Sequence, residues 1–161
     1  MSNEQTLYES LKSEDDLGAV VRAHIHIEAA LTELIESQLV APEHLQKMDL
    51  EYHDRVKLAL ACGLNERFAG PLNALGTLRN NFAHKLGMKL GANEVNSLYE
   101  AFGSEDKDKI QQSYQRTKKR IKDKVPKSFS KLEPKDRFSL IAITLQSIVV
   151  LAAGIKADES A

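Results

Sequence analysis

Cysteine is almost missing from this sequence, with Cys62 the single example among 161 residues. One cysteine excludes an intrachain disulfide and a cysteine-based metal cluster, and a chain without disulfides suits a reducing compartment. The first residues, MSNEQTLYESLKSEDDLG, also lack the basic start and the apolar run of a secretory signal. We therefore expect a cytoplasmic protein.

Motifs for nucleotide binding and covalent catalysis are missing as well. The stretches GLNERFAG and KLGMKLG match neither a P-loop nor a dinucleotide-binding fingerprint. No serine lies in a nucleophile-elbow sequence, and Cys62 lies in an apolar helical pattern in which a thiol is inert. The sequence therefore predicts no covalent intermediate and no cofactor.

The period-two alternation of β-strands is absent over any useful length, whereas apolar residues recur every three or four positions. A chain of 161 residues, of which 42% are hydrophobic and 28% charged, fits one folded domain. We predict an all-α fold, a single bundle of about five to seven helices. It comprises an N-terminal segment (1–16), a helical domain (17–156) with a basic helix and loop at 104–137, and a tail (157–161).

Six helices follow from the apolar spacing and the turn residues. The first, at 17–39, ends before Pro42, and the second, at 50–62, stops at Gly63. Gly70-Pro71 opens the third and a fourth covers 94–102. A polar helix with few core residues, at 106–124, is expected to project from the bundle, and the last covers 134–155. The predicted core faces of the first and third helices are Leu17, Val20, Val21, Ile25, Leu31, Leu34, Ile35 and Leu39, and Leu72, Leu75, Leu78, Phe82 and Leu86.

The longest apolar run, residues 138–155, has about the minimum length for crossing a bilayer. It contains Ser139, Thr144, Gln146 and Ser147, polar groups that are costly in lipid but tolerable in a helix buried within protein. We interpret the run as a buried core helix and expect no membrane association.

Charge is unevenly distributed, although the net charge is only −1. Residues 1–54 carry twelve acidic and three basic side chains, whereas residues 107–137 carry twelve basic and four acidic ones. A local basic surplus is typical of proteins that bind a phosphate backbone, although a solvated helix face is its commoner cause. The candidate nucleic-acid-binding residues are Lys118, Lys119, Arg120, Lys122 and Lys124.

The segment LGTLRNNFAHKLG places three polar residues, Arg79, Asn80 and His84, on one helix. Asn80 and His84 are four positions apart and share a face. Arg79 and His84 lie roughly 140° apart around the helix, so within one chain they do not point at a common spot. Pairing this helix with its copy across a two-fold axis would bring arginine and histidine together, which predicts a homodimer.

This motif, RNNFAH, resembles the signature of HEPN domains, which have an arginine, a polar residue and then a histidine on one helix. The preceding stretches HIHIEAALTELIESQL and DRVKLALACGL look like the related mannitol-repressor-like (MtlR) proteins, so the resemblance covers roughly residues 19–90. Many HEPN proteins are metal-independent ribonucleases of toxin–antitoxin, CRISPR-linked and anti-phage systems. The resemblance implies a HEPN-like bundle, with RNA and an antitoxin or regulatory protein as partners.

The chemistry implied by the resemblance is RNA cleavage through the internal 2′-hydroxyl. His84 would take the 2′-hydroxyl proton or protonate the leaving oxygen, because histidine titrates near neutrality. Arg79 would stabilise charge on the phosphorane, since its fork fits phosphate oxygens. Asn80 would orient His84 or the phosphate. The products would be a 2′,3′-cyclic phosphate and a 5′-hydroxyl.

His24 and Glu28 form a second polar pair, four positions apart on the first helix. This spacing can bring two metal ligands together. His26 faces the opposite side, however, and histidines hydrogen-bonded near a bundle core are commoner, so we predict no metal site. Alternatively, His24 or Glu28 reaches the Arg79 site from the adjacent helix and holds it.

The favoured function is RNA cleavage or RNA binding, with the segment Lys107–Arg137 on the backbone and the motif at the scissile phosphate. One alternative is a non-enzymatic regulator resembling the MtlR proteins, which would act through protein contacts or DNA and tolerate His84→Ala. Another is an antitoxin-like or scaffolding partner. In a purely structural interpretation, Arg79 pairs with a surface acid while Asn80 and His84 form hydrogen bonds along the helix and stabilise a dimer.

Overall fold

The computed structural model describes residues 3–120 and 128–160, and all regular structure in these ranges is helical. The α-helices are α1 (Asn3–Lys12), α2 (Asp16–Glu36), α3 (Tyr52–Ala61), α4 (Ala69–His84), α5 (Ala92–Glu100), α6 (Ser104–Arg120) and α7 (Pro134–Ser160). Three short 3-10 helices, η1 (Pro42–Lys47), η2 (Glu66–Phe68) and η3 (Phe129–Lys131), lie in the connections. The prediction of an all-α fold is confirmed.

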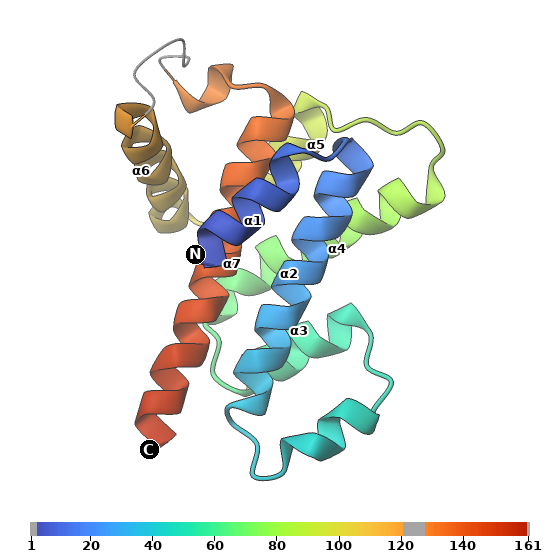
Figure 1. Ribbon diagram of the computed structural model, residues 1–161, viewed down its shortest axis with the longest axis vertical. Helices are drawn as coiled ribbons and strands as arrows, with labels where there is room; N and C mark the ends of the chain where they lie inside the picture. Colours follow the sequence, from blue (N-terminus) through green and yellow to red (C-terminus); the bar gives the residue numbers. More distant parts are fainter. Residues whose placement is uncertain (1–2, 121–127, 161) are drawn as a thin grey trace.

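Helices α2 and α7 pack along each other and form the centre of the fold (Figure 1). The core between them includes Ile27, Leu31 and Leu34 of α2 and Phe138 and Ile141 of α7, all fully buried. Each such side chain stabilises the fold by about 1.5–3 kcal/mol relative to exposure. Helices α1, α5 and α6 pack on α7, whereas α3 and α4 pack on α2 and on each other. Two layers therefore flank the central pair, and α3 and α4 form the layer that matters for the candidate site.

The N-terminal segment belongs to this core, although the sequence predicts that the domain begins at residue 17. Leu7 and Leu11, one turn apart on α1, are fully buried, and α1 packs on both α2 and α7. Asp15 then separates the two helices, because its carboxylate accepts a hydrogen bond from the Gly18 N–H at 2.7 Å and caps α2. At the other end, α7 continues to Ser160, past the predicted start of the tail.

Of the described helices, α7 alone is long and apolar enough to cross a membrane, over Pro134–Gly154, and half of that span is buried inside the fold. Its hydroxyl groups are satisfied locally: Ser139 donates to the Lys135 carbonyl at 2.9 Å and Thr144 to the Leu140 carbonyl at 2.8 Å. These bonds let polar side chains lie in an apolar helix that packs against four others.

The basic helix was expected to project from the bundle, and the structure corrects this, because α6 packs on α7. Ile110 and Tyr114, four positions apart, are buried, and the Tyr114 ring contacts Phe129 of η3 with centroids 6.2 Å apart. Asp106 is buried too, and pairs with Arg67 of η2 at 3.0 Å. Two apolar side chains at helical spacing are therefore enough to anchor a helix whose other residues are mostly polar.

Four residues predicted to lie in the core are exposed instead: Leu17, Ile25, Leu39 and Leu86. Leu86 lies beyond the end of α4, because the backbone leaves the helical conformation and becomes extended at Lys85 (φ −115°, ψ 105°). Leu17 and Ile25 lie on α2, about two turns apart, and both side chains are exposed. The apolar stripe of α2 is wider than the surface that its neighbouring helices bury, so the residues at its edges stay exposed. One of them, Ile25, lines a cleft.

Candidate functional site

Helix α4 carries the motif and presents it on a polar face. Its opposite face is buried through Pro71, Leu72, Leu75, Leu78 and Phe82. Gly76 packs against Tyr52 so closely that an added Cβ would lie 2.9 Å from the ring carbon Cε1. The exposed face carries Asn73, Thr77, Asn80 and His84, which follow one another at three- and four-residue spacing. The packing of α4 on α2 and α3 therefore decides which way these polar groups face.

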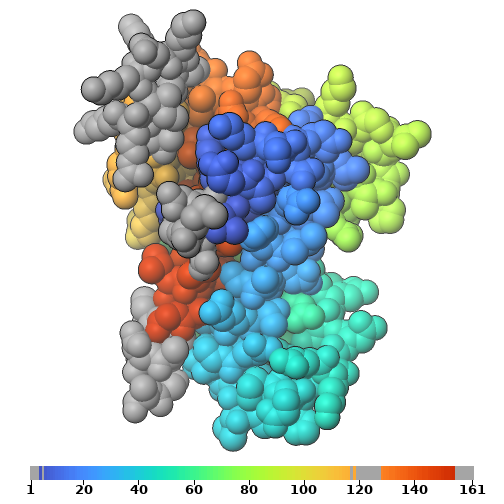
Figure 2. Space-filling model, viewed as in Figure 1, coloured from blue at the N-terminus to red at the C-terminus, as the bar shows by residue number. Residues whose placement is uncertain are grey.

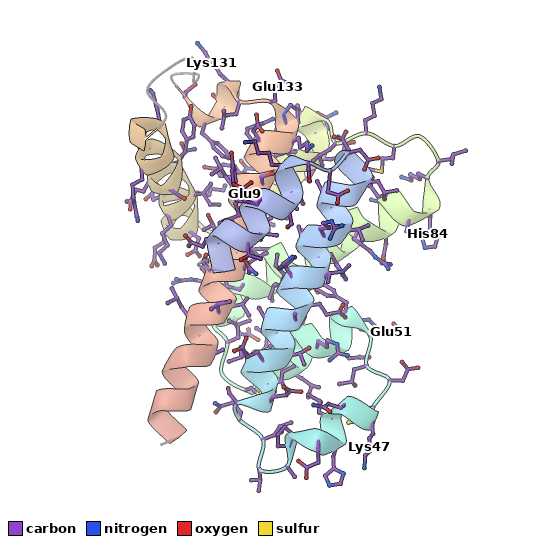
Figure 3. The ribbon with its side chains drawn as sticks, viewed as in Figure 1. Glu9, Lys47, Glu51, His84, Lys131 and Glu133 are labelled. Carbon is purple, nitrogen blue, oxygen red and sulfur yellow. The ribbon has the colours of Figure 1, made fainter. Side chains whose placement is uncertain are left out.

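A cleft of about 620 Å³ lies between α2, α4 and the start of α3. Helix α2 lines it with Val21, His24, Ile25 and Glu28, the start of α3 with Glu51, Tyr52 and His53, and α4 with Asn73, Gly76, Thr77, Arg79, Asn80 and His84. Figure 3 shows Glu51 and His84 on the same side of the molecule. The outline in Figure 2 is indented there, between the green and teal segments. Most of the lining is polar, which suits a charged or hydrogen-bonding ligand.

All three motif residues line this single cleft. The sequence predicts that Arg79 and His84 of one chain point to different sides of the helix. In the structure both line the cleft, because it extends along α4 from Asn73 to His84. The Arg79 guanidinium donates a hydrogen bond to the Asn80 side-chain oxygen, from Nη1 to Oδ1 at 3.1 Å. Asn80 therefore orients Arg79; within the described residues it makes no hydrogen bond to His84.

The acid that a purely structural interpretation requires for Arg79 is not found in the part of the chain that the structure describes. The ion pairs there hold other arginines: Arg22 pairs with Glu14, and the Arg55 Nε lies 3.4 Å from a Glu28 oxygen. Glu28, predicted as a residue that could hold Arg79, is thus held by α3. Arg79 is half-buried at the cleft, and most of its guanidinium N–H groups make no hydrogen bond to the described residues, so they can bind a ligand.

His24 is the most buried histidine of the cleft, with 7% of its surface exposed. Its ring contacts that of Tyr52 with centroids 4.2 Å apart, and the Tyr52 hydroxyl donates to the Leu72 carbonyl at 2.8 Å. Burial lowers the pKa of His24, Arg79 lowers this pKa further, and Glu28 opposes the shift. Burial, with a contribution from Glu28, raises the pKa of Tyr52. At neutral pH the cleft therefore contains a neutral imidazole beside a protonated phenol.

Apart from His24 and His84, the histidines lie at the rim of the cleft or outside it. His53 lies 3.4 Å from a Glu51 oxygen and 3.3 Å from an Asp54 oxygen, which ties it to the first turn of α3. His26 and His44 do not line the cleft. In the ranges that the structure describes, no group of three or more histidine, cysteine or acidic side chains is arranged to hold a metal ion.

The predicted RNA-binding residues lie away from the cleft. Helix α6, which carries Lys118, is on the opposite side of the molecule from the end of α4 (Figures 1 and 3). Lys118 is half-buried, the side chains of Lys119 and Arg120 are not among those described, and Lys122 and Lys124 lie outside the described residues. Within one chain, the structure thus groups the motif with His24 and Glu28 and separates it from α6.

Two contributions to the cleft were not predicted from the sequence. The polar face of α4 extends two turns before the motif, through Asn73 and Thr77, and its three- and four-residue spacing was a usable signal. Tyr52 gave no such signal, because its role depends on Gly76 lying against its ring.

Comparisons with protein-family models, curated proteins and solved structures find no match for this chain.

Proposed function

We propose that this protein is a HEPN-like, metal-independent endoribonuclease that binds RNA in the cleft beside α4. The observation that carries the proposal is the presence of Arg79, Asn80 and His84 in one cleft, with the guanidinium oriented by Asn80 and facing no acidic partner among the described residues. An oriented arginine and a histidine in one cleft match what phosphodiester cleavage through a neighbouring hydroxyl needs.

In the proposed reaction, Arg79 binds the nonbridging oxygens of the scissile phosphate and stabilises the charge that grows on them as the 2′-oxygen attacks. His84 takes part in proton transfer, either from the 2′-hydroxyl or to the leaving 5′-oxygen. Both steps use groups of this chain. The products carry a 2′,3′-cyclic phosphate and a 5′-hydroxyl.

The protein would also contact the RNA backbone, a second copy of itself and a regulatory protein. The basic residues of α6 and those that follow it in the sequence would bind the RNA backbone by charge, and α6 lies at a distance from the cleft. We further propose a cytoplasmic homodimer whose activity an antitoxin or another regulatory protein controls. The exposed Ile25 at the cleft and Leu86 just beyond His84 offer apolar surface for such contacts.

The test is incubation of a mixed RNA pool in EDTA with wild-type protein, Arg79→Ala and His84→Ala, followed by analysis of the product ends. We expect wild type to generate 2′,3′-cyclic phosphate ends and each variant to be slower by about 10²–10³-fold, the usual effect of removing an acid–base or charge-stabilising group. His44→Ala is the matched control, because His44 is exposed and outside the cleft. Equal activity of His84→Ala and wild type would contradict the proposal.

A non-enzymatic regulator of the MtlR-like type is the second candidate. The exposed apolar side chains of Leu17, Ile25 and Leu86, of which Ile25 lines the cleft, favour it, because exposed apolar surface can serve for protein contacts. It predicts that wild type leaves every RNA in the pool intact. The same experiment therefore separates the two functions, and an antitoxin-like or scaffolding role would share the regulator's result.

A further inference from the structure

The cleft contains a second histidine that the RNNFAH motif does not include. His24 is buried against Tyr52 but lines the cleft, and among the described residues no hydrogen bond to its ring nitrogens is found. Among the described residues, the polar atoms that are both fully buried and unpartnered lie on other side chains, so the His24 nitrogens reach the open cleft, where one can accept a proton or bind a ligand. Its orientation is set, because Tyr52 is itself tied to the Leu72 carbonyl.

The charged and titratable groups around His24 come from all three elements packed there. Glu28 lies one turn further along α2, Arg79 faces it from α4, and Tyr52 from α3; Glu51 and His53 lie at the rim. Glu28 is engaged by Arg55, and Tyr52 stays protonated. Two opposite charges therefore act on His24, Glu28 from the same helix and, more weakly, Arg79 from across the cleft, and Arg79 is also the group proposed to hold the phosphate.

We propose, on the basis of the nuclease function above, that His24 is the general base of the reaction and that His84 is the general acid. A ring nitrogen of neutral His24 takes the proton of the 2′-hydroxyl, and the 2′-oxygen attacks phosphorus. The bond from phosphorus to the 5′-oxygen breaks, and protonated His84 gives its proton to that oxygen. His24 ends protonated and His84 neutral, and exchange with solvent restores both.

The different environments of the two rings support this assignment of roles. Burial favours the neutral form of the His24 imidazole, with a smaller contribution from Arg79 and opposition from Glu28, and the neutral form is the one that accepts a proton. His84 is exposed at the end of α4, where solvent can supply its proton. Two titratable groups whose surroundings differ in this way are the usual basis for dividing acid and base roles in one site.

The experiment uses a short RNA containing a bond that wild type cleaves, prepared with oxygen or with sulfur at the bridging 5′ position. A thiolate leaves without being protonated, so it removes the need for a general acid but not for a base. We expect His84→Ala to be slower than wild type by about 10²-fold or more on the oxygen substrate and to recover to within about tenfold on the sulfur substrate. His24→Ala should stay impaired by about 10²-fold or more on both.

Three controls keep the test specific. His24→Gln retains a polar side chain at the buried position, and thermal unfolding of both His24 variants shows whether they fold. His26→Ala changes a histidine of α2 that does not line the cleft, and should match wild type on both substrates. Added imidazole should restore part of the rate of His24→Ala, which a loss of packing alone would not allow.

Each other outcome has a definite meaning. Recovery of His24→Ala with sulfur while His84→Ala stays impaired would overturn the assignment of roles. Folded His24 variants within about threefold of wild type on both substrates would show that His24 is not catalytic, while loss of activity in His84→Ala would still uphold the proposed function. If wild type cleaves no RNA, the nuclease function and the role of His24 fail together.

Discussion

The buried imidazole of His24 links the stability of the protein to pH. In the unfolded chain this histidine has an ordinary pKa near 6.5, and in the folded protein burial and Arg79 lower that pKa. As the pH falls through 6.5, the unfolded state therefore takes up a proton that the folded state does not. The free energy of unfolding should decrease on this account until the pH drops below the folded pKa.

The measurement is urea unfolding of wild type and of His24→Gln between pH 7.5 and 5. The stability advantage of wild type over His24→Gln should shrink as the pH falls, because glutamine does not titrate. His26→Gln provides the comparison for a histidine outside the cleft. If the difference between wild type and His24→Gln stayed constant over this range, the imidazole would have the same pKa in both states.

At the scale of helices, the contact between α3 and α4 depends on the missing side chain of Gly76. An alanine there would place Cβ within 2.9–3.0 Å of two Tyr52 ring carbons. The ring cannot easily yield, because it is held by the Leu72 carbonyl and packs on His24. Overpacking of this kind costs about 1–3 kcal/mol, whereas alanine gains about 1 kcal/mol over glycine in a helix. We expect Gly76→Ala to lower stability by about 1 kcal/mol.

Thermal unfolding of Gly76→Ala and Gly154→Ala gives the measurement and its control. Gly154 lies in α7, and an added Cβ there would meet nothing within 4 Å, so its alanine variant should be as stable as wild type or slightly more stable. Gly76→Ala should instead unfold a few degrees lower. Equal stabilisation of both variants would mean that Tyr52 moves aside freely.

The helices with a clear apolar spacing were predictable from the sequence, whereas α1 was not, and α6 was predicted as a helix without its packing on α7. Helix α4 combines a proline in its first turn with a regular buried face, so both the helix and its motif could be identified. Helix α1 is held by Leu7 and Leu11, too few to distinguish it from a polar segment. The cleft was predictable only in part: the motif indicated α4, and the spacing of His24 and Glu28 indicated α2. The role of Tyr52 depends on tertiary packing that no local pattern encodes.

At the scale of the whole molecule, the basic residues of α6 are separated from the motif on α4, and this separation bears on how RNA is bound and cleaved. Part of the basic surplus lies on α6, whereas the motif lies across the bundle at the end of α4 (Figure 1). Charge at that distance can raise the local concentration of RNA, but it cannot stabilise the reacting phosphate, since screening by salt acts over about 8–10 Å. Affinity and chemistry should therefore be separable by mutation.

Reversing the charge of Lys118, Lys119 and Arg120 together should weaken RNA binding and leave the cleavage rate at saturating RNA within about threefold of wild type. The affinity should also depend less steeply on salt, because each backbone contact that is lost removes close to one unit from the slope of log K against log salt. Fluorescence anisotropy between 50 and 300 mM salt, combined with single-turnover cleavage, measures both.

Arg79→Ala should show the reverse pattern, with a large loss of rate and a smaller change in salt dependence. A cleavage rate at saturation that fell as far in the charge-reversed protein as in Arg79→Ala would contradict this separation, and would place the basic residues next to the scissile phosphate, for example through the second chain of a dimer.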